Sequence, residues 1–149
     1  MPINKNVNIN KNNVAEKERV LQLAYKDLIT FGKLFAPADF LASKSPPFHY
    51  HVGKVLLDRK IPQTALIIPR DHCKSTLAST AILHKFLFAT KEQPEFICWI
   101  GEAQDQAIDN LHWVQNHIYE NPNIHYYFGD LTGNKWTKTD FTLKNGCRM

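Results

Sequence analysis

The chain has 149 residues, enough for one domain with a sizeable core, and its 44% hydrophobic and 21% charged content is ordinary for a globular protein. Its net charge of +4, with histidines neutral, suits a partner that carries phosphates but does not identify one. Three widely spaced cysteines argue against a disulfide framework or a zinc site, the N-terminus does not resemble a signal peptide, and no apolar stretch approaches the ~18 residues that span a bilayer.

The first part of the chain predicts a tail followed by two helices. Residues 1–13 hold six asparagines without periodicity, which predicts a flexible tail ahead of a single domain at 14–149. Apolar residues recur at helical spacing over 14–35, which predicts a helix. Prolines break the pattern over 36–47, and a second short helix is expected over 48–59.

The chain is organised around the stretch that begins at Thr64. Residues 64–68 form a short apolar run of the kind found in buried parallel strands, and Pro69 ends it. A polar connection at 70–73 follows, and Lys74 opens a helix that we expect to continue to Ala89. Strand, short loop, Lys-Ser-Thr and helix is the order of a phosphate-binding loop, in which backbone N–H groups hold phosphate oxygens and the lysine reaches the outer phosphates.

The glycines of the usual loop pattern are missing. In G-x-x-x-x-G-K-[ST], the glycine positions fall on Ile68 and Cys73. An ordinary helix start is therefore the alternative interpretation. Lys74, however, has the wrong charge for a helix N-terminus, and Arg70 adds a second cation. Two cations beside free N–H groups favour an anion site.

The second half predicts another strand, a long helix and a hairpin. Residues 95–100 (EFICWI) are continuously apolar, which predicts a second parallel strand with Cys98 in the core. Two such strands joined by a helix form a right-handed βαβ unit, and thus a parallel sheet flanked by helices. Residues 102–119 predict a helix and 121–133 turns. A half-exposed strand is expected over 136–144, before a two-residue Asn-Gly hairpin turn.

At this point the sequence resembles a known family. The segment PRDHCKST, at 69–76, is similar to the variant Walker A of large terminase subunits, the ATP-driven motors that package the DNA of tailed bacteriophages. The segments CWIGEAQDQAIDNL and FGDLTGNKWTKTDFTLKNG resemble parts that follow in that family, and Pro47-Phe48-His49 resembles its adenine-side element. The resemblance runs from about Phe31 to the last residue. It implies a P-loop NTPase-like α/β domain with a parallel sheet, of which this chain holds the N-terminal part.

The resemblance also implies roles for individual residues, with ATP and Mg²⁺ as cofactors. Lys74 would contact the β- and γ-phosphates, Ser75 would bind Mg²⁺, and Thr76 would bond the α-phosphate. The backbone of 71–73 would cradle the β-phosphate, and Arg70 would stabilise charge on the γ-phosphate. The residues placed in the nucleotide site are Phe48, His49, Pro69, Arg70, Asp71, His72, Cys73, Lys74, Ser75 and Thr76.

No convincing Walker B acid follows the apolar runs. Glu102 opens a helix, and Asp130 follows a short run among turn signals. We therefore expect a truncated chain that binds ATP without hydrolysing it. In the full motor, the resemblance implies a ring of subunits acting on double-stranded viral DNA, with the small terminase subunit and the portal or procapsid as partners, in the host cytoplasm and without membrane. A helicase-like translocase and a non-catalytic truncated product are the alternatives.

Overall fold

The computed structural model describes residues 11–61 and 63–149, apart from the side chains of 11–13. The chain is α/β, mostly helical, with a small antiparallel sheet of two strands. Of the predicted tail, residues 1–10 lie outside the described residues, and α1 begins at Lys11. In chain order the elements are α1 Lys11–Lys26, α2 Leu28–Phe35, α3 Pro37–Phe40, α4 Pro47–Leu57, α5 Lys74–Phe88, α6 Gln104–Glu120, α7 Pro122–Phe128, β1 Thr132–Trp136 and β2 Phe141–Leu143.

The predicted helices at 48–59, 74–89 and 102–119 are confirmed as α4, α5 and α6. The helix predicted over 14–35 is instead two helices, because Asp27 interrupts it with an extended backbone. The Asp27 carboxylate accepts hydrogen bonds from the Thr30 backbone N–H at 2.8 Å and from the Thr30 hydroxyl at 2.6 Å. Asp27 therefore caps α2 and starts a new helix, which a count of apolar spacing does not reveal.

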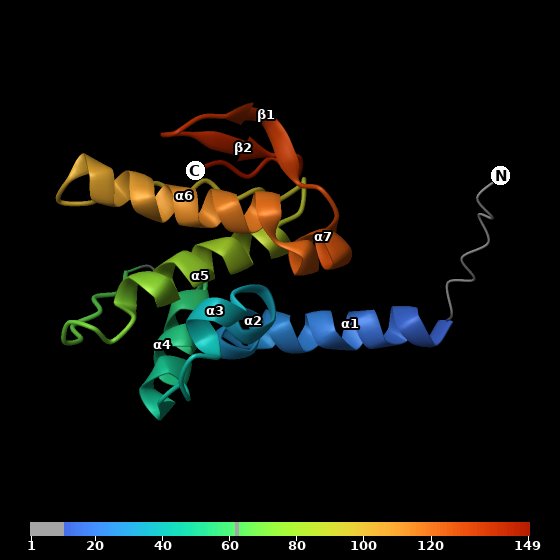
Figure 1. The fold of residues 1–149 in the computed structure, drawn as a ribbon, viewed down its shortest axis with the longest axis horizontal. Coiled ribbons are helices and arrows are strands. Elements are labelled where there is room, and N and C mark those ends of the chain that lie inside the picture. The colour runs from blue at the N-terminus through green and yellow to red at the C-terminus, as the bar shows by residue number, and fades with distance from the viewer. Residues whose placement is uncertain (1–10, 62) are drawn as a thin grey trace.

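Helix α5 lies at the centre of the molecule. Figure 1 shows it between α6 and α7 on one side and the layer of α1 to α4 on the other, with β1 and β2 beyond α6. Its side chains are buried along most of its length, from Leu77 to Leu87. Leu83 and Phe86 pack in the core with Phe31 of α2 and Val114 of α6. The burial of these side chains holds α5 in place from both sides.

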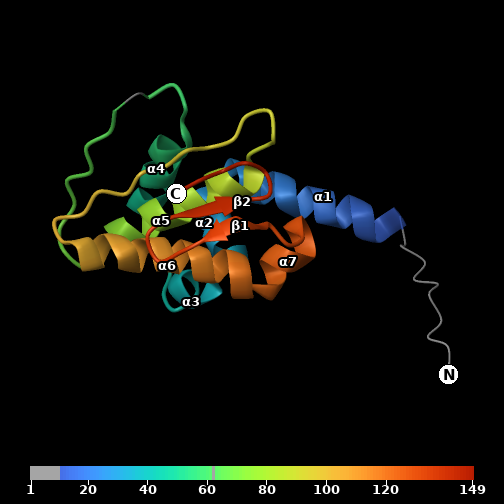
Figure 2. The ribbon, with the colours of Figure 1, turned by 90° about the horizontal axis from the view of Figure 1, so that it is seen from above.

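The parallel sheet predicted from the two apolar runs is absent from the described residues. Neither 64–68 nor 95–100 is a strand, although Figure 2 shows both running in the same general direction towards the starts of α5 and α6. The second run makes a single parallel bridge, in which Arg148 N–H donates to Glu95 O at 2.9 Å and Ile97 N–H donates to Arg148 O at 3.0 Å. A strand forms only where a neighbour pairs with its backbone, and the first run has no such neighbour in the described chain.

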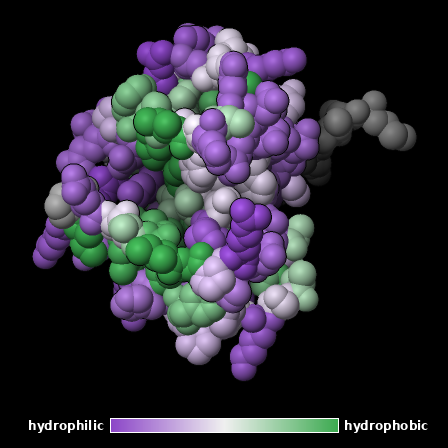
Figure 3. All heavy atoms as spheres, turned by 90° about the vertical axis from the view of Figure 1, so that its left-hand side faces the viewer, coloured by the Kyte–Doolittle hydropathy of each residue, from purple (hydrophilic) through white to green (hydrophobic). Residues whose placement is uncertain are grey.

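The two apolar runs are covered on one face only. Leu66 and Ile68 pack on the cluster around the start of α5, whereas Ile67 is 96% exposed. In the second run Phe96, Cys98 and Ile100 are exposed, so the prediction that Cys98 is a core residue was wrong. Apolar side chains accordingly gather on the side of the molecule seen in Figure 3.

The turn-rich segment predicted over 121–133 contains the helix α7. Asn121 caps this helix, since its side-chain oxygen accepts from the N–H groups of Asn123 at 3.0 Å and Ile124 at 3.4 Å, and Pro122 occupies the first turn. Asn-Pro is a turn signal, but the same pair also serves as a helix start. The local sequence does not separate the two outcomes.

The C-terminal turn lies where the sequence predicts it, but its loop is longer than two residues. The strand predicted over 136–144 was wrong in extent, because β1 ends at Trp136 and β2 begins only at Phe141. Leu143 N–H donates to Cys147 O at 2.8 Å and Gly146 N–H donates to Leu143 O at 2.9 Å, which leaves a three-residue loop. Only Gly146 in this loop has a positive φ, at 88°, as the glycine of a three-residue hairpin loop does. The Asn145 amide anchors the loop to α5 by donating to Phe86 O at 2.8 Å.

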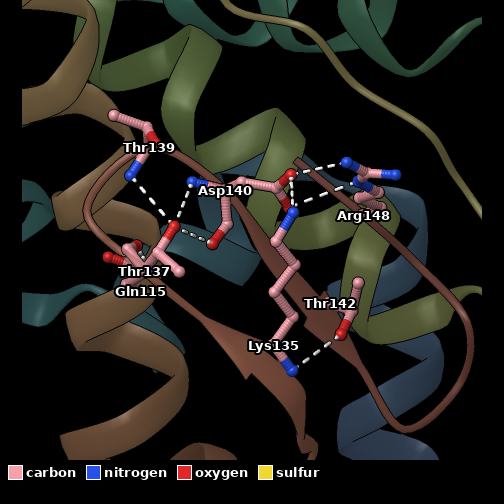
Figure 4. A network of polar contacts seen from close by, with 7 residues as sticks. All are labelled: Gln115, Lys135, Thr137, Thr139, Asp140, Thr142 and Arg148. Carbon is pink, nitrogen blue, oxygen red and sulfur yellow. Dashed lines mark hydrogen bonds and ion pairs between the residues drawn. The ribbon is translucent and has the colours of Figure 1, made fainter.

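A polar network, drawn in Figure 4, joins the hairpin to the chain end. The Asp140 carboxylate pairs with Arg148 at 2.5 Å and with Lys135 at 2.6 Å. The hydrogen bond from Arg148, and then that from Lys135, hold the pKa of Asp140 below its usual range. Gln115 of α6 donates to Thr137 O at 2.8 Å, so the loop between the strands is also tied to the helix beneath it.

His84 predicts a pH dependence of stability. Burial lowers the pKa of His84 from 6.5 to about 4 in the fold, against the hydrogen bond between its Nε2 and Tyr25 O. Because the unfolded chain binds this proton more readily, the contribution is complete above pH 6.5 and disappears as the pH falls towards 4. We expect a loss of roughly 3 kcal/mol in the free energy of unfolding over this range.

The measurement is denaturant unfolding of the wild type and His84→Gln between pH 7 and 4. Glutamine keeps an N–H donor for Tyr25 O but does not titrate. The variant should lose less stability than the wild type over the same range. Equal losses in both proteins would show that His84 is not the group responsible.

Candidate phosphate-binding loop

Residues 69–76 connect the first apolar run to α5 at the molecular surface. Within this loop Lys74 and Thr76 are half-buried, and the other residues are exposed. Leu77, one residue further on, is buried with Ile29 and Val52. The loop is therefore accessible from solvent, while Leu77 anchors the start of α5 in the core.

The loop backbone is left-handed at one of the two glycine positions of the usual pattern, Cys73, but not at the other, Ile68. Asp71 has a φ of 64° and Cys73 a φ of 57°, and both lie in the left-handed region. Cys73, a predicted glycine position, stands directly before the right-handed residues of α5. A left-handed residue followed by a right-handed one turns successive N–H groups to the same side and forms a concave site for anions. Side chains with a Cβ hold this conformation at an energetic cost.

The first turn of α5 has open N–H donors. The helical ladder begins with Leu77 N–H, which donates to Cys73 O at 2.9 Å. Cys73 makes no side-chain capping bond, and no acceptor in the described chain reaches the N–H groups of Lys74, Ser75 or Thr76. Open N–H groups and the positive end of the helix dipole together attract an anion.

Lys74 bends back over the loop. Its Nζ donates to Ile68 O and to Pro69 O, both at 2.6 Å. These bonds join the helix start to the end of the apolar run and keep the ammonium group beside the open N–H groups. The sequence predicted a phosphate contact for Lys74 but gave no signal for these two carbonyl partners.

Arg70 and His72 form the outer part of the loop. His72 Nδ1 donates to Arg70 O at 2.7 Å, because a carbonyl oxygen can only accept. The Arg70 guanidinium is exposed, and it forms no ion pair with any residue that the structure describes. Arg70 is thus available to a ligand in the loop.

The structure brings Phe48 to the loop and places His49 in the interior. The Phe48 ring is half-buried, with its centroid 5.9 Å from that of His72 and 4.4 Å from that of His49. His49 is buried, and its Nε2 has no hydrogen-bond partner among the described residues. Phe48 is therefore the better placed of the two to contact a base beside the loop.

The acidic residues considered from the sequence lie in other settings. Asp130 pairs with Lys144 and accepts from Thr132 N–H at 2.9 Å, which lowers its pKa and fixes the entry to β1. Glu102 is exposed ahead of α6. Within residues 11–61 and 63–149, no three His, Cys, Asp or Glu side chains form a cluster that could hold a metal ion. Ser75, the predicted Mg²⁺ ligand, is exposed in the first turn of α5.

Helix α6 supports the start of α5 through a contact that the sequence did not reveal. Ser79, buried in α5, donates its hydroxyl to the Asn110 side-chain oxygen at 3.3 Å. Trp113 of α6 packs on the cluster that contains Leu77. The loop therefore has a rigid support on its helical side.

Comparisons of the chain with protein-family models, with curated proteins and with solved structures found no match. Among the described helices, none is both long and apolar enough to cross a membrane.

The left-handed conformation of Cys73 predicts that glycine suits this position. We expect Cys73→Gly to be more stable than Cys73→Ala by about 0.5–1 kcal/mol, because relief of the left-handed Cβ outweighs the greater freedom of glycine in the unfolded chain. Denaturant unfolding of the two variants measures the difference.

The matched control is the same pair of substitutions at Ser75, which lies in the first turn of α5 and has no positive φ. There the order should reverse, with Ser75→Gly less stable than Ser75→Ala by about 0.5 kcal/mol. The same order at both positions would contradict the loop conformation.

Proposed function

We propose that residues 69–76 bind the phosphates of ATP together with Mg²⁺. The proposal rests on the left-handed Cys73 directly before an uncapped helix, in which no acceptor of the described chain reaches the N–H groups of Lys74, Ser75 and Thr76. This arrangement suits a chain of phosphates better than a single carboxylate, because several N–H groups and two cationic side chains are close together.

In this proposal each loop residue has one role. Lys74 leaves its two carbonyl partners to contact the β- and γ-phosphates, and Ser75 binds Mg²⁺. Thr76 N–H or its hydroxyl meets the α-phosphate, and the backbone of 71–73 surrounds the β-phosphate. Arg70 faces the γ-phosphate from the outer side of the loop.

The base would lie against the start of α4. Phe48 provides a half-exposed aromatic face near His72, which suits stacking on adenine. Buried His49 supports Phe48 edge-on rather than touching the base itself. Pro69 completes the loop by ending the apolar run that leads into it.

At the level of the fold, the proposal is that α5 and the runs beside it belong to a P-loop type of domain. Two extended apolar runs, each leading to the start of a helix, support this assignment. Apolar side chains on their outward faces are exposed. In a P-loop domain, further strands and helices would cover these faces.

The resemblance to large terminase subunits gives the wider proposal. The chain would be the ATP-binding portion of a motor that couples hydrolysis to translocation of double-stranded viral DNA. Its partners would be the small terminase subunit and the portal or procapsid, and it would act as a ring in the host cytoplasm. Hydrolysis needs an acidic metal ligand and a water-activating glutamate, and the described part of the loop region supplies neither.

Thermal unfolding with Mg-ATPγS tests ATP binding. Ligand at about a hundred times its dissociation constant should raise the free energy of unfolding by roughly 2.7 kcal/mol. Lys74→Ala should abolish the increase, and Ser75→Ala should reduce it only when Mg²⁺ is present.

Lys54→Ala is the matched control, because Lys54 is an exposed helical lysine away from the loop. It should keep the full increase. A wild-type protein that unfolds cooperatively without any stabilisation by Mg-ATPγS would overturn the proposal. That result would leave a non-catalytic product as the better account.

A further inference from the structure

A polar hollow lies at the end of α5 that is opposite the phosphate loop. Its volume is about 450 Å³, within the usual range of small-ligand sites. It is lined by the last turns of α1 and α5, the end of α4 and the loop after α5. At about 1.5 Å per residue, the length of α5 separates it from the phosphate loop by roughly 20 Å.

Three cationic side chains from three parts of the chain converge on this hollow. Lys26 ends α1, Arg59 follows α4, and Lys85 lies in the last turn of α5. Neither lysine makes a hydrogen bond or an ion pair with its side chain anywhere in the described structure. Arg59 pairs with Glu95 through one of its nitrogens, and a guanidinium has five N–H donors, so others remain for a ligand.

Helix ends alone do not account for this charge. The C-terminal ends of α1, α4 and α5 each carry about half a negative charge, and Glu95 adds one more, so the three cations still leave an excess of about half a positive charge. The carbonyl groups at the end of α5 are also partly satisfied, since Asn145 Nδ2 donates to Phe86 O at 2.8 Å and Ala89 O at 3.3 Å. The charges of Lys85 and Arg59 add to burial in lowering the pKa of His84, which lies in the same hollow.

An aromatic face borders the cations. Tyr25 is 57% exposed, and its ring stacks on that of His84, with centroids 5.8 Å apart and planes 27° apart. Phe88 contacts Tyr25 edge-on at 5.1 Å and holds it from the side. A ring fixed on one side and open on the other can stack on a nucleobase.

We propose that this hollow binds a nucleotide unit, with its phosphate between Lys26, Arg59 and Lys85 and its base stacked on Tyr25. The nucleotide is either free or part of a single strand, and both present the same phosphate and base. The site is separate from the loop at 69–76 and does not depend on triphosphate binding there.

The test is fluorescence anisotropy with a labelled oligothymidylate of about 12 nucleotides, and competition by thymidine monophosphate. The double variant Lys26→Gln/Lys85→Gln should bind the oligonucleotide at least about tenfold more weakly, with the salt slope reduced by about 1.4, or about 0.7 for each cation lost on a single strand. Tyr25→Leu should weaken binding at least about fivefold at unchanged salt slope. If thymidine monophosphate displaces the oligonucleotide at a similar concentration of nucleotide units, the ligand is a free nucleotide. If displacement requires a large excess of the monophosphate, the ligand is a single strand.

The matched control is Lys33→Gln/Lys54→Gln, which also removes two lysines from last turns of helices but lies outside the hollow. It should bind as the wild type does, and so should Lys74→Ala, which separates this site from the phosphate loop. Thermal melts confirm that each variant is folded. No binding by the wild type, or equal losses in both double variants, would overturn the proposal and leave Lys26 and Lys85 as cations that neutralise helix ends.

Discussion

Helix α5 is buried against helices on both sides, and this burial fixes the positions of the elements around it. Its side chains from Leu77 to Leu87 are enclosed by α2 and α4 on one side and α6 on the other. Each large side chain buried in this way contributes about 1.5–3 kcal/mol, so the helix cannot shift without losing much of the core. Both ends of α5 are therefore fixed, and each end carries polar groups that the core does not use. The open N–H groups lie at one end, and the converging cations lie at the other.

A rigid helix also explains how the loop before it holds an unfavourable backbone. Asp71 and Cys73 occupy left-handed conformations that residues with a Cβ disfavour. The bonds from Lys74 to the carbonyls of Ile68 and Pro69 oppose relaxation of this loop, because they tie the helix start to the apolar run. Strain of this kind persists only where the surroundings enforce it, and it is common at ligand sites.

Sequence patterns located most helices, since apolar spacing and end signals are local. They also identified Cys73 as a glycine position, which its positive φ now explains. The parallel sheet that the same patterns predicted is absent from the described residues, because a strand requires a backbone partner and apolar runs do not show whether one is present. For the same reason the prediction that Cys98 lies in the core was wrong. Helix α7 was missed because Asn121-Pro122 fits both a turn and a helix start. The cationic hollow joins residues from Tyr25 to Gln93, and no local pattern links them.

Backbone amide resonances followed during titration with Mg-ATPγS test whether the start of α5 binds phosphates. If the start of α5 binds phosphates, the largest shifts should occur at the N–H groups of Cys73, Lys74, Ser75 and Thr76. Helix α6 provides an internal comparison, because Ala103 at its start also lacks a side-chain capping bond. Little change at Gln104 and Asp105, together with large changes at 73–76, is the predicted result. Equal changes at the two helix starts, or none at 73–76, would contradict the account.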